Sequence, residues 1–107
     1  MPTYNKLVRD FIPEIIKKNG KQLNTSILTD EEYVIELKAK LEEEVKEFLE
    51  AEGKEDSVEE LADVLELLYA LANQLGSSAE ELEHVRAQKA KDRGAFNDKV
   101  YLIDVED

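Results

Sequence analysis

Two groups of carboxylates have a spacing that could support chemistry. Glu43, Glu44 and Glu47 lie in one acidic run, and Glu60 and Asp63 follow after twelve intervening residues. Side chains three or four positions apart project from the same side of a helix, so each group can present its acids together. Glu60 and Asp63 also stand in an apolar stretch, where a carboxylate with no compensating charge is costly to bury.

Convergence of these acids would create a cation site. If their helices pack antiparallel, Glu44, Glu47, Glu60 and Asp63 meet, and four carboxylates need a compensating charge. A hard divalent cation suits oxygen ligands, with Mg²⁺ as the default and Mn²⁺ as the alternative. Because Mg²⁺ pairs with substrate phosphates, the cluster is a candidate phosphoryl site. Glu66 could join it. Alternatively, the acids belong to a solvated face, since the chain holds 26 Asp and Glu residues.

Apolar periodicity and capping signals predict four helices, so the expected fold is all-α and resembles a four-helix bundle. Thr29 or Asp30, then Ser57 and Ser78, are the expected N-caps of the last three helices. The helices are expected at about residues 12–18, 30–52, 58–75 and 79–92. The third is apolar on nearly all sides, which is typical of a central helix. Neighbouring helices of a monomer could cover it, or a homodimer could complete the core.

Strand signals are confined to the ends of the chain. Residues 4–8 and 100–105 are short and rich in β-branched or aromatic residues, so they could pair and bring the termini together. A single domain spanning 1–107 is expected, because 107 residues with 42% hydrophobic content can build one core.

Composition excludes several classes of function. A net charge of −12 argues against binding to a nucleic-acid polymer or to an anionic membrane surface. There is no spanning apolar run and the first residues are too polar for a signal peptide, so a cytoplasmic protein is expected. The chain has no Cys and a single His, His84. Thiolate and multi-His metal sites are therefore excluded, and a Ser-His-Asp triad is disfavoured.

The acidic motifs resemble a known signature. Glu43-Glu44-Val45-Lys46-Glu47 followed by Glu60-Leu61-Ala62-Asp63 is similar to the EExxE…ExxD pattern of the all-α NTP pyrophosphohydrolases. That superfamily includes MazG, the dimeric dUTPases and phosphoribosyl-ATP pyrophosphohydrolase. Segments 4–16 and 89–96 resemble its small single-domain branch, described as phosphoribosyl-ATP pyrophosphohydrolase-like or as house-cleaning enzymes.

The resemblance implies a MazG-type domain that cleaves a nucleoside triphosphate between its α and β phosphates, giving a monophosphate and pyrophosphate. Carried over to this sequence, Mg²⁺ would be held by Glu44, Glu47, Glu60 and Asp63. Glu43 would orient or deprotonate the attacking water. Two other functions stay open: phosphoribosyl-ATP hydrolysis in histidine biosynthesis, and a non-catalytic acidic helical module that binds a basic partner. The base and the sugar of the substrate are not specified by these residues.

Four basic residues are candidates for binding the substrate phosphates. Lys6 and Arg9 lie near the start of the chain, and Lys89 and Arg93 lie near its end. Arginine suits bidentate contacts with phosphate oxygens, and terminal pairing would bring the two pairs together. The alternatives for Lys89 and Arg93 are a solvated face or ion pairs with neighbouring acids such as Asp92. The alternative for Arg9 is a local ion pair with Asp10.

Overall fold

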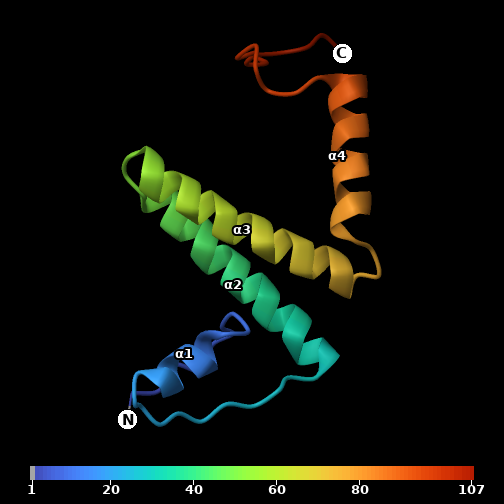
Figure 1. Cartoon of the computed structure of the whole chain (residues 1–107). Coiled ribbons are helices and arrows are strands. Elements are labelled where there is room, and N and C mark those ends of the chain that lie inside the picture. The colour runs from blue at the N-terminus through green and yellow to red at the C-terminus, as the bar shows by residue number, and fades with distance from the viewer. Residues whose placement is uncertain (1) are drawn as a thin grey trace.

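The computed structural model describes residues 2–107, which form four α-helices and no strand (Figure 1). The helices are α1 (Ile12–Lys18), α2 (Asp30–Glu50), α3 (Lys54–Gln74) and α4 (Ala79–Arg93). The all-α prediction is confirmed. None of these helices is both long enough and apolar enough to cross a bilayer.

Side-chain caps start α2 and α4 where the sequence predicts them. The Thr29 hydroxyl accepts a hydrogen bond from the Glu32 backbone N–H at 3.2 Å, and the Glu32 carboxylate accepts one from the Thr29 N–H at 2.9 Å. These bonds satisfy free backbone donors at the start of the helix, and the bond from the Thr29 N–H to the carboxylate lowers the pKa of Glu32. The Ser78 hydroxyl accepts in the same way from the Glu81 N–H at 3.0 Å.

Helix α3 begins at Lys54, four residues before the predicted start, so the prediction of Ser57 as its N-cap is wrong. Gly53 occupies the cap position with a φ of +81°, which residues with a Cβ rarely adopt. This conformation lets the chain turn directly from α2 into α3. The Ser57 N–H then donates to the Gly53 carbonyl within the first helical turn, at 3.2 Å.

An antiparallel hairpin of α2 and α3 is the main packed unit (Figure 1). In residues 2–107 the buried apolar side chains are Leu37 of α2 and Ala72 of α3, and Glu44 is the buried charged one. Helix α4 packs against α3 alone, and α1 packs against none of the other three helices. The hairpin therefore carries the only helix pair that is packed along its length in the part of the chain described.

The predicted β pairing of the termini is wrong. Residues 4–8 and 100–105 form no strand, and the two chain ends lie at opposite ends of the molecule (Figure 1). Helix α4 leads away from the hairpin and carries the C-terminal segment with it, in a molecule measuring 62 × 35 × 26 Å. Asn5 and Lys99 also adopt positive φ, at +45° and +59°, which is incompatible with a regular strand at either position.

Candidate metal centre

The hairpin brings the two acidic motifs together. Glu44 and Glu60 are each eight residues from Glu52 in the connecting turn, so the antiparallel arrangement sets them side by side. Glu44, Glu60 and Asp63 each offer a carboxylate oxygen within 4.8 Å of the other two. The convergence of Glu44, Glu60 and Asp63 was predicted from the spacing of the two motifs on antiparallel helices.

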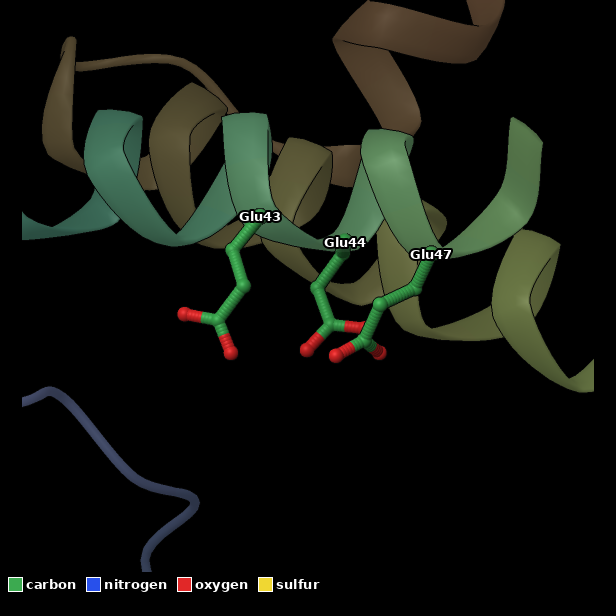
Figure 2. A group of neighbouring side chains, drawn as sticks. All are labelled: Glu43, Glu44 and Glu47. Carbon is green, nitrogen blue, oxygen red and sulfur yellow. The ribbon is translucent and has the colours of Figure 1, made fainter. Parts of the chain in front are cut away.

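A second trio overlaps the first at Glu44. Glu43, Glu44 and Glu47 of α2 also bring carboxylate oxygens within 4.8 Å of one another. Figure 2 shows their three side chains pointing to the same side of the helix. All five acids singled out in the two motifs therefore belong to one cluster, and Glu66 belongs to neither trio.

Two carboxylate oxygens in the cluster are buried without a donor. Glu44 is only 7% exposed, and its Oε2 has no hydrogen-bond partner among the described residues; the same holds for Oε2 of Glu60. A buried carboxylate oxygen with no donor is unfavourable. A cation between the helices would satisfy both atoms, and the all-oxygen donor set fits Mg²⁺ or Mn²⁺.

The pKa values of the cluster reflect this crowding. Desolvation, followed by the negative charge of Glu47 and the nearby Glu44, raises the pKa of Glu60 to about 7. Burial, followed by the charge of Glu47, also raises the pKa of Glu44. Without a cation, the cluster therefore retains a proton near neutral pH. Binding of a divalent cation would displace that proton.

Lys40 supplies part of the compensating charge, a role that we did not predict. Its Nζ lies 3.4 Å from a carboxylate oxygen of Glu44 and 3.6 Å from one of Glu43. This contact lowers the pKa of Glu44 and so opposes the effect of burial. The sequence spacing indicates these ion pairs, because Lys40 precedes Glu43 by three positions and Glu44 by four on the same helix.

Arg9 reaches the cluster from the N-terminal segment. Its guanidinium Nη2 donates to Oδ1 of Asp63 at 2.6 Å. The alternative of a local pair with Asp10 does not occur. The Asp63 side chain is 39% exposed and that of Arg9 is 58% exposed, so the pair is open to exchange with solvent or a ligand. One positive side chain thus lies where an anionic ligand of the cluster would be.

The other predicted phosphate ligands are placed elsewhere. Lys6 lies over the ring of Tyr4, with its Nζ 5.8 Å from the ring centroid. Lys89 and Arg93 are exposed residues of α4, which leads away from the hairpin (Figure 1). Asp92 accepts a hydrogen bond from Gln88 at 3.1 Å. A single chain does not bring the basic end of α4 to the acids, and a phosphate-binding role for these residues stays a prediction.

Geometry and sequence comparison agree on the class of protein. An all-α chain with two acidic motifs facing each other across a helical hairpin is the arrangement expected of a MazG-type domain. Residues 25–100 match the model of the MazG-like family. The chain belongs to this family.

The relatives do not define the activity further. An uncharacterized protein of Mycolicibacterium smegmatis is 43% identical over 54 residues, which is 50% of this chain and 55% of that protein. The chain therefore spans about half the length of that relative. No solved structure matches the chain.

Proposed function

We propose that this protein is a Mg²⁺-dependent nucleoside triphosphate pyrophosphohydrolase with a house-cleaning role. Its reaction would consume one water and break the anhydride between the α and β phosphates, releasing a nucleoside monophosphate and pyrophosphate. The observation that carries the proposal is the pair of buried, unpartnered oxygens of Glu44 and Glu60 inside the acidic cluster of a MazG-like chain.

The chain's own residues divide into three roles. Glu44, Glu47, Glu60 and Asp63 would hold the cation, which supplies charge neutralisation at the phosphates and activation of water. Glu43 and Glu47 are both exposed members of the α2 trio, and Glu43 is the one that this scheme does not need as a ligand. It would orient the attacking water and accept its proton. No Cys or Ser nucleophile is required for this chemistry.

Arg9 would act on the substrate. Its guanidinium, now on Asp63, would transfer to a phosphate oxygen when a cation takes over the Asp63 carboxylate. Lys6, Lys89 and Arg93 remain proposed phosphate ligands. For Lys89 and Arg93, such contact needs either a movement of α4 or a second chain.

The decisive experiment measures pyrophosphate release from standard, deoxy and damaged nucleoside triphosphates and from phosphoribosyl-ATP, with Mg²⁺ and with EDTA. We expect Mg²⁺-dependent release with a monophosphate product. Asp63→Ala should abolish release while the helical circular dichroism is retained. Glu66→Gln is the matched control, because it changes an acid of the same helix outside both trios.

The results also separate the alternatives. Preference for phosphoribosyl-ATP would assign the chain to histidine biosynthesis instead of house-cleaning. A folded protein that releases nothing and gains no thermal stability from Mg²⁺ or Mn²⁺ would refute the proposal and favour a non-catalytic acidic module.

A further inference from the structure

Lys40 directs its ammonium group to the acidic cluster and not to the acid that most often pairs with a lysine on a helix. Glu36 precedes Lys40 by four positions on α2, and a glutamate four positions before a lysine is the favoured order for such a pair. The two residues form no ion pair among those that the structure describes. Lys40 Nζ instead lies 3.4 Å from a carboxylate oxygen of Glu44 and 3.6 Å from one of Glu43. A local partner is therefore available in the sequence, and the folded chain favours the cluster.

The Lys40 ammonium lies between two acids in different surroundings. Glu43 and Glu44 project from the same side of α2 (Figure 2). The Lys40 side chain is 19% exposed and that of Glu43 is 42% exposed, whereas Glu44 is buried. Because an ammonium group carries several N–H donors, one lysine can hold both carboxylates. Lys40 thereby connects Glu44, a proposed metal ligand, with Glu43, the acid that would accept a proton from the attacking water.

Filling of the metal centre would leave Lys40 with one of these two acids. Once Glu44 shares its negative charge with a divalent cation, it attracts the ammonium less, and two positive charges at this range repel each other. Glu43 is the other acid in contact with Lys40, and it is not a ligand in the proposed scheme. The interaction of the ammonium would therefore pass to Glu43.

The position of Glu43 matters for the proposed reaction. A general base acts only within hydrogen-bond reach of the water that it deprotonates. An exposed glutamate side chain has several rotatable bonds, and holding it in one rotamer costs conformational entropy. An ammonium group on one carboxylate oxygen restricts this motion and leaves the second oxygen free to accept a hydrogen bond from water.

We propose that Lys40 is the positioning residue of Glu43: it bridges Glu43 and Glu44 before a cation binds, and it holds Glu43 alone once Glu44 is a ligand. This inference rests on the proposed function, because it concerns the same site and the same reaction. It gives a reason for a nearly buried lysine beside carboxylates that a cation would otherwise compensate. Lys40 acts through Glu43 and contacts neither the reacting phosphate nor the water.

The first test is a double-mutant cycle of pyrophosphate release. Lys40→Met should lower kcat by about tenfold, which is part of the roughly 10²–10⁴-fold contribution of a general base, and should leave KM within about twofold. Lys40→Arg keeps the charge and should restore most of kcat. In the Glu43→Gln background, Lys40→Met should cause no further loss, because its effect depends on Glu43.

Lys38→Met is the matched control for this cycle. Lys38 is an exposed lysine of the same helix, two positions from Lys40 and therefore on the opposite side of α2. It forms no ion pair with another described residue. Its replacement removes the same charge from the chain and should leave kcat and KM unchanged.

The second test needs no turnover and compares melting temperatures in EDTA and in saturating MgCl₂. In EDTA, Lys40→Met should lower the melting temperature with or without Glu43, because Glu44 also holds the ammonium. In Mg²⁺, the same substitution should lower it only where Glu43 is present. Lys40→Gln, which keeps a hydrogen-bond donor without the charge, takes the place of Lys40→Met if that variant does not fold.

The outcomes distinguish this inference from the proposed function. An equal loss of kcat in the Glu43→Gln background, or a loss of melting temperature in Mg²⁺ that does not depend on Glu43, would overturn the role of Lys40. A chain that shows the expected melting temperatures but releases no pyrophosphate would refute the proposed function and still support the transfer of Lys40 to Glu43. A chain that gains no stability from Mg²⁺ would overturn both.

Discussion

Acidification should weaken Mg²⁺ binding in the neutral range because the cluster must lose a proton to accept the cation. With a pKa of about 7, Glu60 is protonated in about nine molecules of ten at pH 6 and in about one of ten at pH 8. The apparent dissociation constant should therefore rise about tenfold between pH 8 and pH 6. The raised pKa of Glu44 acts in the same direction.

Isothermal titration of metal-free protein with MgCl₂ measures this effect. Repeating the titration in buffers of different ionisation enthalpy reports the proton released on binding. Glu66→Gln should behave as the unmodified chain, whereas Glu60→Gln should bind more weakly and lose most of the pH dependence. An affinity that is constant between pH 6 and 8, with no proton release, would refute the assignment of the raised pKa to the metal centre.

The same group links pH to the stability of the metal-free protein. The pKa of Glu60 is raised in the folded state from its ordinary 4.5. Its contribution is therefore fully present below pH 4.5 and is lost as the pH rises through about 7. In EDTA, Glu60→Gln should become increasingly stable relative to the unmodified chain from pH 5 to pH 8. Thermal unfolding of both proteins at equal concentration tests this, and parallel curves would contradict it.

Three further substitutions, with Arg86→Ala as a control, separate the roles of other residues. Glu43→Gln should lower kcat by about 100-fold or more if Glu43 accepts the proton of the attacking water. Calorimetry should show a nearly unchanged Mg²⁺ affinity for this variant. A selective loss of Mg²⁺ affinity would instead make Glu43 a metal ligand. Arg9→Ala should raise the KM for the triphosphate yet tighten binding of Mg²⁺ alone by up to about fivefold, because an exposed ion pair contributes at most about 1 kcal/mol. Arg86→Ala, which breaks the Glu83 pair on α4, should change neither quantity. Thr29→Ala should lower the free energy of unfolding by about 1 kcal/mol through loss of the α2 cap, measured by urea denaturation at fixed protein concentration, and no change would show that the capping box contributes little.

Local features were predictable because their causes lie within a few residues. Helix α1 ends at Lys18, before Asn19 and Gly20, as expected, and the caps Thr29 and Ser78 hold their expected helices. The error at α3 has a local cause as well. Ser57 fits the sequence pattern of an N-cap, but Gly53 is the residue that caps α3. The positive φ of Gly53 allows the helix to begin at Lys54.

The convergence of the acids was predictable from the sequence, whereas the surroundings of the acids were not. Glu44 and Glu60 meet because motif spacing and a short turn leave an antiparallel hairpin little freedom. The contact between Arg9 and Asp63 joins residues 54 positions apart and follows no local rule. The path of α4 likewise decides where Lys89 and Arg93 lie.

By itself, the sequence determined the helical class, the caps and the pairing of the two acidic motifs, since these follow from helical periodicity and short-range hydrogen bonds. Only the tertiary structure decided which oxygens are buried without a donor, how far the pKa of Glu60 rises and which apolar residues of the hairpin stay exposed. Those properties depend on what the rest of the chain places, or fails to place, around each side chain.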